Sequence, residues 1–251
     1  MGCGGGGGVG CGSRRGIITL FLFSNKDIYL KTNIPIRMNM NTITYKITGN
    51  RCVLSFHEPN EIFCRALADS KLFGGITITQ TFTHAGFYAK TCCSLRELLS
   101  QRREKLQYIE GVKMAQCIGQ QLFYLEKYAH TFSWFNLDDI LVIDESSFLC
   151  IGLEQLMPVD AFGRIWFTTP FSLKQPHIAP EIQRLKTLPS YVTYKAAYYS
   201  LGSLITFCLA MDDENNTKMP LRLEFIADTK LYWFLLRCIE PVANARLLLF
   251  V

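Results

Sequence analysis

The amino-acid sequence predicts an α+β protein in which a mostly β first third precedes a mostly helical remainder. From Gly16 to about Lys90, apolar and β-branched residues follow the two-residue period of strands. From Ser94 onward, apolar residues recur at three- and four-residue steps, the period of amphipathic helices. The chain has 251 residues, of which 49% are hydrophobic and 19% charged. This composition is typical of a globular protein, and the length allows one large domain or two lobes.

The first third contains predicted strands around one helix. The helix runs from Asn60 to Leu72, because Glu61 lies in its first turn and Gly74-Gly75 follows its end. A Gly49-Asn50 turn joins two of the strands. In chain order the predicted strands are Ile17–Phe23, Thr42–Ile47, Cys52–Phe56, Ile76–Phe82 and Gly86–Ala89.

The remainder contains predicted helices. The first begins at Ser94, which forms a capping box with Glu97. The others are Tyr108–Tyr128, Val192–Ala210 and about Leu223–Ile239. The change of period near Cys92-Cys93 divides the chain into a Gly-rich tail (1–15), a small mostly β unit (16–92) and a larger helical unit (93–251).

The Gly-rich tail is predicted to be flexible and without a specific function. Acylation at Gly2 and Cys3 is the less favoured alternative, because the myristoylation pattern wants Ser or Thr where Gly6 stands.

Charge and composition limit the partners and the compartment. The net charge of +5 is scattered without a basic run, which argues against nucleic-acid binding. The longest apolar stretches are shorter than the roughly 20 residues of a membrane span. The ten cysteines lack metal-ligand spacing and indicate free thiols in a reducing compartment, the cytoplasm.

Residues 131–154 resemble a protein-kinase catalytic loop and the metal-binding turn after it. Counting from Ile140-Leu141, Trp134 stands in the slot of the catalytic Asp, Asn136 in the Lys slot and Asp139 in the Asn slot. Gly152-Leu153-Glu154 replaces Asp-Phe-Gly.

Three later segments extend the resemblance over about residues 94–250. Ile178-Ala179-Pro180-Glu181 resembles the Ala-Pro-Glu that closes a kinase activation segment. Tyr199-Ser200-Leu201-Gly202 resembles the start of the central large-lobe helix, and Arg246 the arginine that pairs with the Ala-Pro-Glu carboxylate. The stretch is also similar to serine/threonine kinase-like proteins of large DNA viruses.

The resemblance implies a two-lobed kinase-like fold that has lost its chemistry. Trp134 cannot act as a base, Ser55 at the phosphate-binding Lys slot carries no charge, and Gly152 cannot ligate metal. The leading function is therefore a pseudokinase that binds another protein as a scaffold or regulator, with no cofactor. An ion pair between Glu181 and Arg246 is expected to anchor the activation segment.

Two alternatives remain open. An atypical serine/threonine kinase would bind ATP and Mg²⁺ through Asp139 with Glu154 or Asp138, and Lys46 or Lys90 would replace the missing lysine. The other alternative is a structural or assembly protein that reuses the fold and is associated with a virion.

Residues 155–175 are the expected contact region for a partner. This segment has few charges, and its large apolar side chains either form a binding surface or fill the core. They are Met157, Phe162, Trp166, Phe167 and Phe171.

Overall fold

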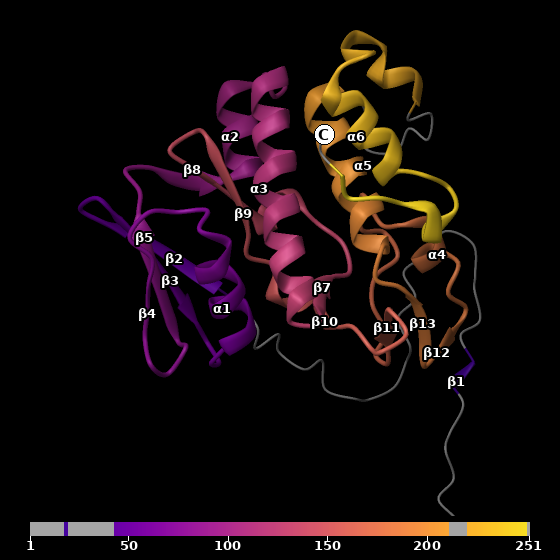
Figure 1. Cartoon of the computed structure of the whole chain (residues 1–251), viewed down its shortest axis with the longest axis horizontal. Coiled ribbons are helices and arrows are strands. Elements are labelled where there is room, and N and C mark those ends of the chain that lie inside the picture. Colours follow the sequence, from indigo (N-terminus) through magenta and orange to yellow (C-terminus); the bar gives the residue numbers. More distant parts are fainter. Residues whose placement is uncertain (1–17, 20–42, 211–219, 250–251) are drawn as a thin grey trace, which may run out of the picture.

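Four strands form an antiparallel sheet at one side of the computed structural model, which describes residues 18–19, 43–210 and 220–249 (Figure 1). β2 (Ile43–Thr48) and β3 (Arg51–Phe56) are joined by the tight turn Gly49-Asn50. Gly49 has a φ of 61°, which glycine adopts without strain. β5 (His84–Tyr88) pairs with β3, and β4 (Thr77–Ile78) forms the other edge.

Helix α1 (Glu61–Ser70) follows β3 and joins the sheet to the rest of the molecule. Its N-cap is Asn60, whose side chain accepts the Phe63 N–H at 2.9 Å. The helix buries Phe63 and Leu67 and packs against α3 (Tyr108–Lys127).

Helix α3 lies at the centre, because it contacts α1, strand β9 and helix α5 (Figure 1). α5 (Ala196–Ala210) is buried along almost its whole length and packs against α6 (Lys230–Cys238). The shorter helices are α2 (Leu95–Arg102) and α4 (Pro180–Gln183).

Short antiparallel strands hold the loops around these helices. β6 (Cys92–Ser94), β8 (Ile140–Ile143) and β9 (Ser147–Cys150) form one sheet, with β8 in the middle. The remaining pairs are β7 (His130–Phe132) with β10 (Leu156–Pro158), β11 (Arg164–Phe167) with β13 (Ser190–Thr193), and β1 (Ile18–Thr19) with β12 (Thr187–Leu188).

Two buried clusters make up the core. The larger cluster is continuous from the four-stranded sheet of β2, β3, β5 and β4 to α5. It includes Leu54, Phe87, Ile118 and Leu204. The smaller one surrounds Trp134 and includes side chains from β11, α4 and β13.

The α+β class is confirmed, with six α-helices and small antiparallel sheets among the described residues. Several predicted boundaries are wrong. The helix over Leu223–Ile239 is broken, because Asp228 adopts a left-handed φ of 62° and Thr229 starts α6 as a new N-cap. The helix expected from Val192 begins at Ala196, since Val192 lies in β13. The strand expected over Ile76–Phe82 is only β4.

Some expectations fall on residues outside the described part of the chain. These are the Gly-rich tail with Gly2 and Cys3, and most of the strand expected over Ile17–Phe23. No helix among the described residues has the length and apolar character needed to cross a membrane. The cysteines in the described part of the chain are free thiols that form no disulfide with one another.

Replacing Gly202 of α5 should destabilise the protein, because the added methyl group has no room. A Cβ atom there would lie 2.8 Å from both Cys238 Cβ and Ile239 Cγ2. Gly202→Ala is expected to cost about 1–3 kcal/mol in urea unfolding. Gly119→Ala is the matched control, because no atom lies within 4 Å of its Cβ position. It should stabilise α3 by roughly 0.5–1 kcal/mol. Equal effects of both changes would contradict the close packing of α5 on α6.

Candidate functional site

Two loops that the sequence places far apart come together beside β8. The first follows β7 and contains Trp134, Asn136 and Asp139, and the second follows β9. Pairing of β7 with β10 brings the loops side by side. The Ile151 N–H donates to the Asp139 carbonyl at 2.7 Å, and the Ser133 N–H donates to the Gln155 carbonyl at 2.8 Å. The described structure therefore brings the expected site residues of both loops together.

Trp134 is packed as a core residue. Only 8% of it is exposed. Its indole lies parallel to the ring of Phe167, with an interplanar angle of 7° and 6.3 Å between centroids. Phe171 contacts it from a second direction at 5.5 Å. The position that the sequence analysis assigns to the catalytic carboxylate is thus occupied by three mutually packed aromatic rings.

The side chains of Gln155 and Asp139 lie close to the position where a Cβ atom of residue 152 would be. A Cβ atom at this position would lie 2.6 Å from Gln155 Oε1 and 3.0 Å from Asp139 Cγ. The backbone φ of Gly152 is −73°, which any residue can adopt. Glycine is therefore needed here for space, and an aspartate in its place would collide with Asp139.

Asp139 lies in an environment that favours its neutral form. Burial raises the pKa of Asp139, and the nearby carboxylates of Glu154 and Asp138 raise it further. The Asn136 amide donates a hydrogen bond to Asp139 Oδ2 at 2.9 Å, which lowers it. Glu154 itself is exposed. Asp138 is also exposed and forms an ion pair with Arg96 at 2.7 Å.

The oxygen atoms around Asp139 fit a hard cation in chemical type. Asn136 Oδ1 and Gln155 Oε1 are buried and have no hydrogen-bond partner. Together with the Asp139 carboxylate they are the kind of oxygen ligands that Mg²⁺ accepts. No group of three or more His, Cys, Asp or Glu side chains in the described part of the chain is arranged to hold a metal ion.

The residue at the phosphate-binding Lys slot and its two candidate replacements lie on or just after strands of the first sheet. Ser55 lies on β3 between Thr44 and His84 of the neighbouring strands. Lys46 is exposed on β2. Lys90 is also exposed, and its backbone N–H donates to Asp144 at 2.8 Å.

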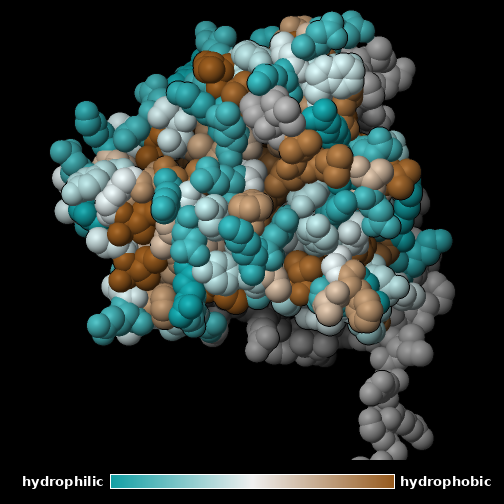
Figure 2. All heavy atoms as spheres, viewed as in Figure 1, coloured by the Kyte–Doolittle hydropathy of each residue, from teal (hydrophilic) through white to brown (hydrophobic). Residues whose placement is uncertain are grey.

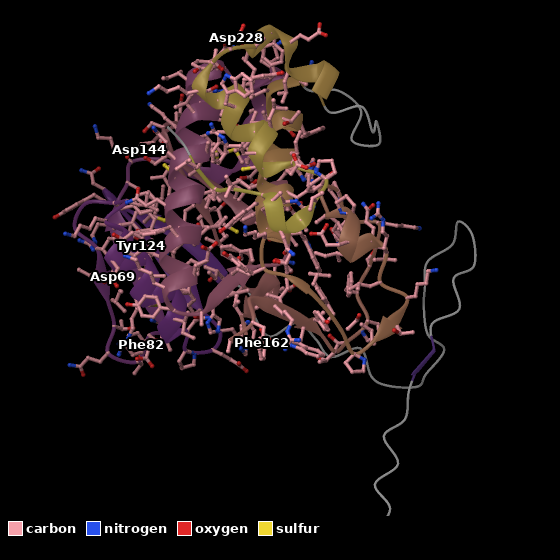
Figure 3. The ribbon with its side chains drawn as sticks, turned by 45° about the vertical axis from the view of Figure 1, so that its right-hand side comes forward. Asp69, Phe82, Tyr124, Asp144, Phe162 and Asp228 are labelled. Carbon is pink, nitrogen blue, oxygen red and sulfur yellow. The ribbon has the colours of Figure 1, made fainter. Side chains whose placement is uncertain are left out.

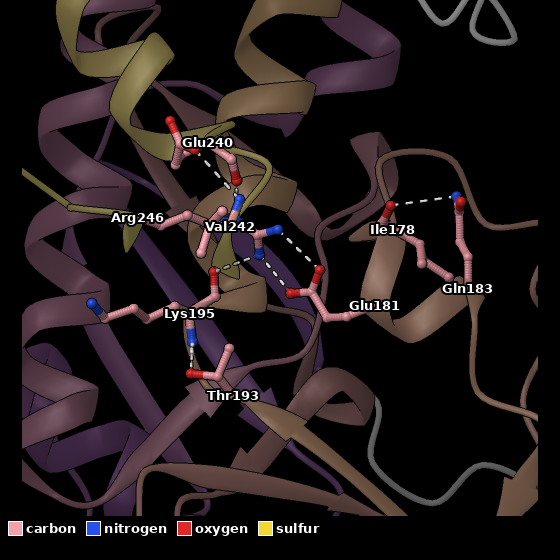
Figure 4. A network of polar contacts seen from close by, with 8 residues as sticks. All are labelled: Ile178, Glu181, Gln183, Thr193, Lys195, Glu240, Val242 and Arg246. Atoms are coloured by element: carbon pink, nitrogen blue, oxygen red, sulfur yellow. Dashed lines mark hydrogen bonds and ion pairs between the residues drawn. The ribbon is translucent and has the colours of Figure 1, made fainter. Parts of the chain in front are cut away.

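Arg246 forms the ion pair that the sequence analysis expects with Glu181 (Figure 4). Its two terminal nitrogens donate to the two carboxylate oxygens at 2.5 and 2.9 Å. The same side chain donates to the carbonyls of Lys195 and Glu240 and lies over the ring of Tyr199 at 4.9 Å. Arg246 is fully buried, so all of these contacts compensate for the loss of its hydration.

His177 is a buried histidine that the sequence analysis missed, because a single histidine carries no pattern. Its Nδ1 lies 3.0 Å from Ser203 Oγ of α5, and its Nε2 is buried without a partner. Burial lowers the pKa of His177 to about 4. The ring is therefore neutral at pH 7.

The antiparallel strand pair β11–β13, whose strands are joined by a long connection that contains α4 and β12, presents different residues on its two faces. Ile165, Phe167 and Val192 point inward and pack with Trp134. The outer residues Trp166 and Tyr191 are directly paired across the strands and are 39% and 50% exposed. Arg164 lies beside them, and Phe162 in the preceding turn, at the lower edge of the molecule in Figure 3, is 79% exposed. We call these four residues, Phe162, Arg164, Trp166 and Tyr191, the ribbon face.

The core interpretation of residues 155–175 is confirmed for part of the segment, and the binding-surface interpretation stays a prediction for the exposed part. Phe167 and Phe171 pack with the core, and Met157 is half-buried against it. Phe162 and Trp166 are exposed.

A separate groove of about 720 Å³ lies between α3, α5 and the segment after α6. Glu126, Tyr198 and Leu249 are among its lining residues. Figure 2 shows apolar side chains on this side of the molecule between α3 and α6. The groove does not include Trp134, Asp139 or Glu154.

Comparison with models of known protein families and with curated proteins finds no match to this chain.

Replacing Arg246 with Ala should cost about 3–5 kcal/mol, because the Glu181 carboxylate loses the partner that compensates its burial. Urea unfolding monitored by circular dichroism measures the loss. Arg65→Ala is the control, since it removes an exposed ion pair with Glu61 and should cost under about 1 kcal/mol. An Arg246→Ala protein as stable as the control would contradict the structural role of the pair.

His177 should make the protein less stable in mild acid. An unfolded histidine binds a proton below about pH 6.5, whereas the folded ring does so only near pH 4. The free energy of unfolding should therefore fall by up to about 3 kcal/mol as the pH drops through this window. His177→Asn should remove this component, because asparagine tolerates the left-handed φ of 62°. Identical slopes for both proteins between pH 6.5 and 4 would exclude His177 as the cause.

Proposed function

We propose that this chain is a kinase-like, catalytically impaired protein, a pseudokinase, that binds another protein as a scaffold or regulator. The observation that carries the proposal is the packing of Trp134. A phosphoryl-transfer site needs a carboxylate positioned to accept the proton of the substrate hydroxyl. The corresponding position here holds an indole that is stacked on Phe167 and lies tilted against Phe171.

The arrangement of the other elements supports the kinase-like part of the proposal. A small sheet with one helix, followed by a helical unit, corresponds to the two lobes of that fold (Figure 1). The Glu181–Arg246 pair occurs where the resemblance expects it. A pseudokinase that keeps structural contacts and replaces catalytic ones would have this pair.

The ribbon face supports the binding part of the proposal. Aromatic residues and arginine are enriched at the centres of protein interfaces, where they contribute most of the binding energy. Phe162, Trp166 and Tyr191 are exposed around Arg164. The inner residues of the same strand pair, β11 and β13, are packed in the core. A rigid support of this kind limits the entropy lost when a partner binds.

One observation favours a second candidate, the atypical kinase that uses ATP and Mg²⁺. Asn136 Oδ1 and Gln155 Oε1 are buried acceptors without partners beside Asp139. A cation bound by these oxygens and by Asp139 would satisfy them, and Glu154 would add a further carboxylate at the surface. The assembly function remains a third candidate, which constitutive incorporation into a large particle would favour.

A thermal-shift titration with ATP, with and without Mg²⁺ or Mn²⁺, separates the first two functions. A ligand that binds only the folded state at 100 times its Kd stabilises the protein by about 2.7 kcal/mol. We expect no rise in Tm at millimolar nucleotide. A metal-dependent rise that Asp139→Ala abolishes would contradict the proposed function and establish the second candidate.

A further inference from the structure

The part of the chain around the ribbon face has a one-sided charge. Between residues 161 and 210 the single acidic residue is Glu181, and its carboxylate is already paired with Arg246. The basic residues of the same stretch are Arg164, Lys174, Arg184, Lys186 and Lys195. With five basic residues and one acidic residue, this stretch has a net charge of +4.

Arg184 and Lys186 are the basic side chains best placed to meet a partner. Both are exposed, and neither has a hydrogen bond or ion pair with the residues that the structure describes. They lie on the segment that leads from α4 through β12 into β13. Ile182 of α4 and Val192 of β13 belong to the buried cluster that the inner residues of β11 also join, so both ends of this segment are held by the same core as the ribbon face.

The ribbon face itself is held in place before any partner binds. Asp160 accepts hydrogen bonds from Arg164 Nε at 2.8 Å and from Trp166 Nε1 at 3.0 Å. Burial acts to raise the pKa of Asp160, but the bonds from Trp166 and Arg164 lower it to about 2. Asp160 is therefore ionised at pH 7 and compensates the charge of Arg164. The exposed side chains of Arg184 and Lys186 keep their charge available for a partner.

We propose that the ribbon face, together with Arg184 and Lys186, binds an acidic segment of another protein. An apolar or aromatic side chain of that segment packs against Trp166 and Tyr191, and its flanking Asp or Glu residues pair with Arg184 and Lys186. This inference rests on the proposed protein-binding function and adds the chemistry of the partner. Complementary charge sets the orientation and speeds the encounter, whereas the aromatic contacts supply most of the affinity.

A single-stranded nucleic acid would also be attracted by positive charge, and its bases can stack on aromatic rings. We favour a protein partner, because the basic residues of the chain form no continuous run. An oligonucleotide is therefore included in the test.

Selection of peptides from a random library displayed on phage, with the purified full-length protein as target, tests the inference. Peptides that are enriched are then synthesised with a fluorescent label, and their Kd is measured by anisotropy. We expect them to combine Asp or Glu with an aromatic or large apolar residue. Their affinity should fall when salt is raised from about 0.1 M to about 1 M, which shortens the Debye length from about 10 Å to about 3 Å.

Variants separate the charged contacts from the aromatic ones. Arg184→Glu with Lys186→Glu should weaken binding by roughly tenfold or more, because attraction becomes repulsion. Lys71→Glu with Lys230→Glu changes the net charge equally at two exposed sites elsewhere, and should leave the Kd within about twofold. Trp166→Ala should also abolish most of the binding.

Each outcome supports or overturns a defined part of the account. Enriched peptides without acidic residues that still need Trp166 would overturn the acidic partner and leave the protein-binding function intact. No enriched peptide, or binding unaffected by Trp166→Ala, would overturn both the inference and this surface as the site of the proposed function. A labelled oligo(dT) that binds more tightly than any selected peptide would overturn the inference in favour of nucleic acid.

Discussion

The buried guanidinium of Arg246 is the constraint on which the helical half of the molecule depends. A charge without access to water must have its donors satisfied by the protein. Arg246 meets this requirement with the Glu181 carboxylate, the carbonyls of Lys195 and Glu240, and the ring of Tyr199. These partners come from α4, from the start of α5 and from the turn after α6. One side chain therefore fixes three segments, and β13 lies in the chain between two of them, α4 and α5.

The strand pair β11–β13 has two different faces. Its inner residues pack around Trp134, and its outer residues remain at the surface. Burying aromatic rings contributes to stability, whereas a carboxylate in the place of Trp134 would be costly to desolvate. The packed inner face gives the ribbon face a defined shape without a ligand.

Local signals in the sequence predicted local structure well. Asn60 and the Ser94–Glu97 capping box mark the starts of α1 and α2 because each bond joins residues three apart. The pairing of Glu181 with Arg246, 65 residues apart, was predicted from a resemblance and not from pattern. The pairing of β11 with β13 was missed because each strand has only four residues and the two strands are distant in sequence. The crowding at Gly152 was equally invisible, since glycine there serves space and not backbone conformation.

Hydrogen–deuterium exchange of the full-length protein, alone and with a selected peptide or with ATP and Mg²⁺, tests the central claim most directly. The claim is that the strand pair β11–β13 packs around Trp134 on one side and binds a protein on the other. It predicts that the peptide slows exchange in residues 162–167 and 184–193, and that nucleotide changes nothing in residues 133–155. Protection of residues 133–155 by ATP and Mg²⁺, without protection of β11 and β13 by any peptide, would contradict the claim.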